Sequence, residues 1–267
     1  MPQTAATRTT GPEHSTSESE ELHEIVEGLL AAPRRIDSRY FYDQYGSQLF
    51  EEITRLPEYY PTRTEIGLLE TNSADITAAL GRGQLLLEPG AGNCGKVRLL
   101  LPDLRPVCYV PVDISGPFLR AAAAELQAEF PTVRVLPLVG DMAAVVDLPP
   151  EYDTLRRNVF YPGSTIGNYQ PAAAEDFLRH MRGVTGSSGN LLVGVDLQKD
   201  VDVLHAAYND SAGVTARFNL NILTHINRLA DADFDVERFR HIAFYNEAEG
   251  RIEIASEEAG PVAGDAR

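Results

Sequence analysis

Short apolar runs along the middle of the chain alternate with amphipathic segments of helical length. The runs are too short for helices and predict strands at 85–87, 109–112, 133–139, 158–161 and 190–197. Between them, the alanine-rich segment 118–130 and the segment 171–181 predict helices. Such an alternation is typical of a parallel sheet with helices on both faces, so we expect an α/β fold from about 84 to 197.

The pattern on the N-terminal side is different. Residues 1–19 are rich in Thr, Ser and Glu with few apolar side chains, and they predict a disordered tail. Apolar residues then recur at helical spacing from Leu22 to Leu29, before Pro33. A second helix is expected at 44–55, inside a tyrosine-rich region at 40–60. The tyrosines indicate either a small core or the aromatic wall of a pocket.

A glycine-rich loop follows the first predicted strand and has two interpretations. The segment 90–96 fits the phosphate-binding pattern G-x-x-x-x-G-K, but Val97 stands where a hydrolase needs a hydroxyl for Mg²⁺. The second interpretation starts at Glu88, continues through the glycines and ends at Asp113, and is the usual arrangement in enzymes that use S-adenosylmethionine (SAM). A glycine turn that binds nothing remains open, as does a role for Asp113 as a cap of the helix near Pro117.

Other predicted strands also end in polar residues. In open parallel sheets, ligands bind at the carboxyl ends of the strands, where Asp113, Asp141 and Asn168 are expected. Asp141 is suited to an adenine amino group, with Met142 packed on the ring, and Lys96 to a carboxylate. The alternatives are a solvent-facing Lys96 and an Asp141 that caps a helix.

Composition narrows the class of partner. The 267 residues are 43% hydrophobic and 23% charged, with a formal net charge of −16, which argues against a nucleic-acid groove and favours a small-molecule substrate. The chain has two cysteines and no apolar run of membrane length, so we expect a cytoplasmic protein without structural disulfides. The six histidines show no H-E-x-x-H spacing, and we predict no metal site.

Four motifs carry a resemblance to a known family. They are LPEYYPTRTE (56–65), YVPVDIS (109–115), GSTIGN (163–168) and DSAGVTARFNLNIL (210–223). In this order, from about residue 35 to 254, the chain resembles the histidine-specific Nα-methyltransferases of ergothioneine biosynthesis. The resemblance implies a Rossmann-like SAM-dependent methyltransferase sheet with a second, smaller substrate domain. The implied reaction methylates the α-amine of histidine three times to give hercynine.

The resemblance also implies roles for individual residues. Its cofactor contacts fall on Gly90, Lys96, Asp113, Asp141 and Met142. Its histidine contacts fall on Tyr59, Asn168 and Tyr208, with Gly163 lining the site and Tyr42 near the reacting amine. An amide and a phenol can donate hydrogen bonds to a carboxylate, and a phenol can also meet an imidazole edge. Tyr42 and Asn168 are therefore the predicted catalytic residues, in an orienting role.

The domain boundaries follow from the same resemblance. We expect a disordered tail at 1–19, the substrate domain at 20–62 and 198–256, the SAM-binding domain at 63–197 and a flexible tail at 257–267. The family continues after 251–254 through a segment that supplies a Glu and a Ser to the imidazole, and ASEEAGPVAGDAR does not match it. A separate C-terminal fragment as partner, a methyltransferase of altered amine specificity and a non-catalytic SAM-binding protein are thus alternatives. A complete chain is expected to be a monomer.

Overall fold

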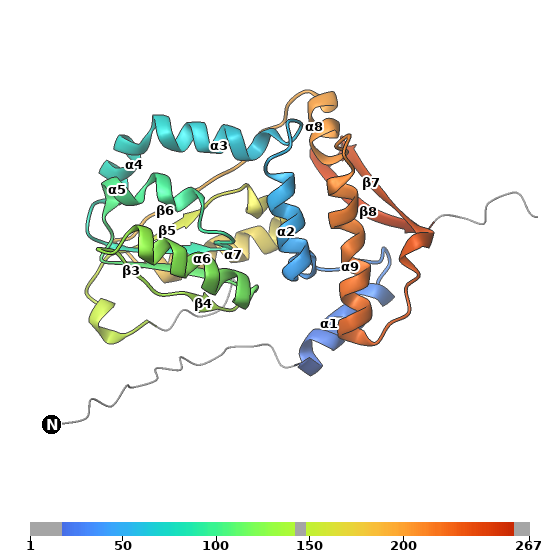
Figure 1. The fold of residues 1–267 in the computed structure, drawn as a ribbon, viewed down its shortest axis with the longest axis horizontal. Helices are drawn as coiled ribbons and strands as arrows, with labels where there is room; N and C mark the ends of the chain where they lie inside the picture. The colour runs from blue at the N-terminus through green and yellow to red at the C-terminus, as the bar shows by residue number, and fades with distance from the viewer. Residues whose placement is uncertain (1–17, 142–147, 259–267) are drawn as a thin grey trace, which may run out of the picture.

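A parallel sheet forms the centre of one half of the molecule (Figure 1). The computed structural model describes residues 18–141 and 148–258. The sheet consists of β1 (Leu85–Pro89), β2 (Cys108–Asp113), β3 (Arg134–Val135), β4 (Leu138–Val139), β5 (Arg157–Tyr161) and β6 (Leu191–Val193). The strand order is β3-β2-β1-β5-β6, with β4 also paired to β2, and every pair is parallel. The predicted α/β fold class is confirmed.

Side chains of successive strand residues enter two separate cores. Leu86 packs on one face against α3 (Tyr60–Thr71), α4 (Ser73–Leu80), α5 (Leu101–Leu104) and α6 (Gly116–Glu129). Leu85 and Leu87 pack on the other face against α7 (Pro171–Thr185). This alternation follows from the two-residue repeat of a strand, and burying each leucine contributes about 1.5–3 kcal/mol. The apolar runs are therefore continuous because both faces of the sheet are covered.

The other half of the molecule is mainly helical and is built from both ends of the chain. Its elements are α1 (Glu18–Leu30), η1 (Ser38–Phe41), α2 (Gln44–Ile53), α8 (Val201–Tyr208), α9 (Val214–Ala230), η5 (Val236–Arg238) and the hairpin of β7 (Phe239–Asn246) and β8 (Arg251–Glu258). Helix α9 is its central element and packs against α1, α2, η1 and the hairpin. In Figure 1, α2 stands between α9 and the sheet, at the junction of the two halves.

The predicted strand at 133–139 is wrong as a single element. Arg134–Val135 and Leu138–Val139 are separate two-residue strands, and both pair with β2. Pro137 lies between them and has no amide hydrogen to donate to the ladder, so pairing stops and resumes after it. Asp141 therefore follows a two-residue strand at the edge of the sheet.

The predicted strand at 190–197 is too long. Strand β6 ends at Val193, and the Gly194 amide donates the last hydrogen bond to the Tyr161 carbonyl over 2.9 Å. Pro162 follows at the end of β5, so the neighbouring strand offers no further ladder. The chain then leaves the sheet, and the Asp196 amide donates to the Ser164 hydroxyl over 2.9 Å.

Shorter elements join the strands to the helices. They are the 3₁₀ turns η2 (Lys96–Leu99), η3 (Pro150–Tyr152) and η4 (Thr165–Asn168). The glycine loop is thus followed by a 3₁₀ turn and then by the single-turn α5. Residues 18 and 19 begin α1, and residues 257 and 258 end β8, while the rest of the two predicted tails lies outside the described residues. Among the described residues, no helix combines the length and apolar character needed to span a bilayer.

Candidate active site

A cavity of about 620 Å³ lies where β1, β2 and β5 end. The glycine loop and α3 border it from the sheet half, and η1 and α2 border it from the helical half of the molecule. Eight of the predicted site residues border this one cavity: Tyr42, Tyr59, Gly90, Lys96, Asp113, Asp141, Gly163 and Asn168. Met142 lies outside the described residues.

The glycine loop has a shape that a side chain would prevent. Gly90 and Gly92 have φ values of 68° and 52°, which residues with a Cβ rarely adopt. The Gly90 amide donates to the Val112 carbonyl over 2.8 Å, so the loop bends back over the end of β2. A Cβ on Gly92 would meet no protein atom within 4 Å, so open space adjoins the loop. The loop therefore presents bare backbone to the cavity, as a nucleoside site requires.

Asp113 joins this loop to the start of α6. Its carboxylate accepts hydrogen bonds from the amides of Gly92 and Ser115, each over 2.9 Å. Burial raises the pKa of Asp113 above its usual range, and these amides act in the opposite direction. The N-cap of α6 is Ser115, and no side chain caps this helix, so the role of Asp113 as a helix cap is wrong. Its bond to the Ser115 amide closes a turn ahead of the helix, and Asp113 also borders the cavity.

Lys96 is not solvent-facing. Its ammonium pairs with Glu65 of α3 over 2.5 Å, and both Glu65 oxygens accept from the Gly163 amide over 2.8 and 2.9 Å. A Cβ on Gly194 would displace the Glu65 carboxylate from its present position. Glu65 thereby connects the glycine loop to the loop after β5.

Aromatic rings form the wall of the cavity on the side of the helical half. Tyr42 packs edge-on against Phe50 with ring centroids 5.6 Å apart, and Phe50 contacts Tyr59 at 6.4 Å. Tyr208 contacts Tyr59 edge-on at 5.9 Å, but it is not among the residues that border the cavity. The tyrosine-rich region at 40–60 thus forms a pocket wall, and Tyr40 enters a core with α9.

These phenols remain protonated at neutral pH. Burial is the largest cause of a raised pKa in each of Tyr42, Tyr59 and Tyr208. The Asp113 carboxylate raises the pKa of Tyr42 further. A neutral phenol can donate a hydrogen bond and present an uncharged ring face, but it is a poor base.

Two remaining predicted residues lie at the rim of the same cavity. Asp141 follows the last residues of β4 and pairs with Arg39 over 3.3 Å, from η1 in the helical half. Asn168 ends η4, in the loop after β5. The structure therefore brings residues from four strand ends to one place.

Sequence reasoning did not assign Glu65, Arg39 or Phe50 to the site. Glu65 stands inside the LPEYYPTRTE motif, and that membership was the available signal. The contacts of Arg39 and Phe50 depend on how η1 and α2 dock onto the sheet, and no local pattern encodes this. Glu88, which was used only to interpret the loop, is also a buried residue at the cavity.

Glu88 provides a pH-dependent prediction. Burial raises its pKa to about 8, although Tyr109 donates a hydrogen bond to it over 2.6 Å. In the unfolded chain the pKa of this carboxyl is near 4.5. Between pH 4.5 and about pH 8, Glu88 therefore keeps its proton in the folded chain and loses it in the unfolded chain. This stabilising contribution is complete below about pH 4.5 and is lost as the pH rises through about 8. We expect the melting temperature of the cofactor-free protein to fall more steeply from pH 5 to 9 than that of Glu88→Gln.

Thermal melts followed by circular dichroism would measure this difference. The exposed Glu70 on α3 gives the matched control, since Glu70→Gln makes the same chemical change outside the core. Its curve should run parallel to that of the unmodified protein. Parallel curves for Glu88→Gln as well would contradict a buried, protonated Glu88.

The fold is Rossmann-like, and its cavity lies at the carboxyl ends of the strands, where such folds bind nucleotides. Comparison with protein families gives a match over residues 21–262 to the family described as histidine-specific methyltransferase, SAM-dependent. The chain belongs to this family, and the resemblance seen in its motifs is confirmed. The family's cofactor is SAM.

Curated relatives agree with the family match. The chain is 43% identical to a histidine N-alpha-methyltransferase of Mycolicibacterium smegmatis and 42% identical to one of Mycobacterium tuberculosis, over 86% of this chain and 72% of each relative. It is also 31% identical, over 80% of this chain and 26% of the relative, to Ergothioneine biosynthesis protein 1 of Neurospora crassa.

Proposed function

We propose that this protein methylates the α-amino group of L-histidine three times to produce hercynine, the first step of ergothioneine biosynthesis. The proposal is carried by one observation. The cavity at the strand ends is bordered both by residues predicted to bind SAM and by residues predicted to bind histidine. The family match and the mycobacterial relatives support the same substrate. The site roles below are part of the proposal.

The residues around the glycine loop fit SAM. Gly90 lies at the bare backbone of the loop, Asp113 would hold the ribose hydroxyls, and Lys96 would hold the carboxylate of the methionine part. Asp141 would accept from the adenine amino group, and Met142 would cover the ring. When bound, SAM supplies a methyl group activated by a sulfonium.

The substrate residues lie on the other side of the cavity. Asn168 and Tyr59 would donate hydrogen bonds to the histidine carboxylate, with Gly163 lining the site between them. Tyr208, which packs against Tyr59, would lie at the imidazole end of the bound histidine. Tyr42 would lie beside the α-amine, where its neutral phenol can orient the nitrogen lone pair.

Positioning supplies most of the rate in this proposal. The α-amine must be neutral to attack, and removal from water in an aromatic pocket favours the uncharged form. After each transfer the aromatic faces of Tyr42 and Phe50 can accommodate the growing ammonium cation. Holding both reactants in the reactive geometry can lower the barrier by about 7–11 kcal/mol, because translational and rotational entropy is lost on binding and solvent reorganisation is avoided, and no covalent intermediate is needed.

The cellular setting is part of the same proposal. Both cysteines are buried free thiols, which suits a reducing cytoplasm. The net charge of −16 suits a small-molecule enzyme that binds no nucleic acid. We expect the chain to act as a monomer.

Titration calorimetry tests cofactor and substrate binding separately. S-adenosylhomocysteine is titrated into the protein first, and L-histidine is then titrated into the loaded protein. We expect both to bind, and L-tryptophan, the matched amino-acid control, to bind far more weakly. Absence of the first binding event would overturn the cofactor site, whereas absence of only the second would overturn histidine as substrate.

A further inference from the structure

Helix α9 carries a stripe of polar side chains that the proposed reaction leaves without a role. Asn221, His225 and Arg228 are spaced by four and three residues, so they lie along one side of the helix. All three contact η1 or the residue that caps α2. Phe218 is an apolar residue on the same side of the helix, three residues before Asn221. Its ring packs against the Tyr42 ring, with centroids 5.6 Å apart.

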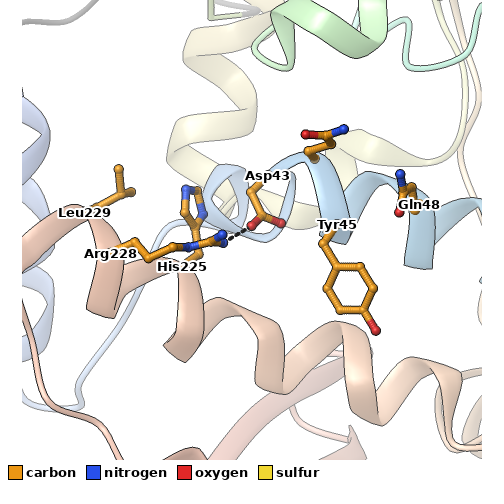
Figure 2. Close-up of a pocket in the computed structure, with 7 residues that line it drawn as sticks. Asp43, Tyr45, Gln48, His225, Arg228 and Leu229 are labelled. Atoms are coloured by element: carbon orange, nitrogen blue, oxygen red, sulfur yellow. Dashed lines mark hydrogen bonds and ion pairs between the residues drawn. The ribbon is translucent and has the colours of Figure 1, made fainter.

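The stripe converges on Asp43, the residue that caps α2. Asn221 donates from Nδ2 to Asp43 Oδ1 over 2.8 Å, and the Gly46 amide donates to the same oxygen over 2.7 Å. Figure 2 shows Arg228 reaching the other side of this carboxylate from α9. Burial alone would raise the pKa of Asp43, but these donors lower it below its usual value, so the acceptor is a carboxylate.

The Asp43 contacts fix the corner that carries Tyr42. Tyr42 is the residue directly before Asp43, and His225 Nδ1 donates to the Tyr40 carbonyl over 2.8 Å on the other side of it. A Cβ on Gly46 would overlap the Phe41 carbonyl, so the backbone of the corner is tightly closed. The position of Tyr42 at the cavity is therefore set by a buried amide on α9, since Asn221 is only 7% exposed.

A second asparagine of the same motif is linked through His241 to Tyr208, which packs against Tyr59 of the aromatic wall. Asn219 is buried, and its Nδ2 donates to the Ala255 carbonyl over 2.8 Å and to His241 Nδ1 over 3.0 Å. Because an amide nitrogen only donates, His241 must accept at Nδ1 and carry its hydrogen on Nε2. That Nε2 donates to the Tyr208 carbonyl over 2.9 Å.

We propose that Asn219 and Asn221 are positioning residues: Asn221 fixes Tyr42 at the cavity, and Asn219 fixes Tyr208, which packs against Tyr59 of the cavity wall. The inference rests on the proposed function, because it assigns both tyrosines to the substrate. It explains why the two amides stand two residues apart in the motif AGVTARFNLN. One rigid helix thereby sets the distance between two side chains that are far apart in the sequence.

Kinetics of Asn221→Leu and Asn219→Leu test the inference. Leucine keeps a similar volume and removes the donated hydrogen bonds. We expect kcat/KM for histidine to fall on the order of 10- to 100-fold, through misplacement of the reacting groups, while the affinity for S-adenosylhomocysteine stays within about twofold. If a leucine variant does not fold, the same measurements are made with serine at that position. Serine keeps a hydrogen-bond donor on a shorter side chain.

Asn227→Leu is the matched control. Asn227 lies on the same helix, and its side-chain amide exchanges hydrogen bonds of 2.8 and 2.9 Å with the backbone of Phe234, away from both tyrosines. It should lower the melting temperature without changing the kinetic constants for histidine. Equal kinetic losses in all three variants would show a merely structural role and overturn the inference.

Hydrogen–deuterium exchange separates this inference from the proposed function. Asn221→Leu should speed exchange of the Gly46 and Ser47 amides at least tenfold, and Asn227→Leu should not. If the unmodified protein forms no methylated histidine, the proposed function fails, whereas unchanged exchange at Gly46 overturns the positioning role of Asn221 whether or not the protein is active.

Discussion

Replacing Asp113 with alanine is expected to abolish cofactor binding. The change removes the acceptor that holds Gly92 in its cavity-facing conformation, and with it the proposed ribose contact. Loss of a buried, charged acceptor costs about 3 kcal/mol or more, which corresponds to at least a 100-fold weaker affinity. Calorimetry with S-adenosylhomocysteine measures this change.

Two controls accompany the Asp113 variant. Asp75→Ala changes an exposed carboxylate on α4 and should leave the affinity unchanged. Asp113→Asn keeps one acceptor oxygen and should retain the fold while still binding the cofactor weakly. If Asp113→Ala binds S-adenosylhomocysteine with the affinity of the unmodified protein, the ribose assignment is wrong.

Replacing Asn168 with aspartate is expected to give the largest loss on the substrate side. The two side chains have the same shape, but the carboxylate cannot donate a hydrogen bond and would repel the histidine carboxylate. Like charges brought together in a site cost several kcal/mol, so kcat/KM for histidine should fall by about three orders of magnitude. Cofactor affinity should stay close to that of the unmodified protein.

Gln170→Glu controls for the added charge. Gln170 lies two residues further along, just before α7, and does not border the cavity within the described residues. This variant has the same net charge as Asn168→Asp and should retain nearly full activity. An Asn168→Asp enzyme that methylates histidine at an undiminished rate would remove Asn168 from the substrate site.

The sheet and most of the site could be predicted because their signals are local. Continuous apolar runs such as 85–87 reflect strands buried on both faces, and Asp113 follows its strand directly. Two predicted strands had wrong boundaries, because the length of a strand depends on hydrogen bonding to the neighbouring strand. Pro137 divides one predicted strand, and β6 stops where β5 ends at Tyr161.

Contacts between elements that are distant in the sequence could not be predicted locally. Glu65 pairs with Lys96, and Asn221 with Asp43, over sequence separations that no periodicity records. For both pairs, only membership in a conspicuous motif indicated that the residue matters. In Figure 1, α2 and α9 come from opposite ends of the chain and lie against each other, with α2 between α9 and the sheet.

Mass spectrometry of a histidine methylation reaction tests the central claim most directly. The protein is incubated with SAM and isotopically labelled L-histidine, and the label is followed through each methylation state. We expect the label to pass through mono- and dimethylated histidine and to accumulate as trimethylated histidine, with S-adenosylhomocysteine formed in threefold amount. Labelled histidine that remains unmethylated, in a protein shown by calorimetry to bind S-adenosylhomocysteine, would contradict the account.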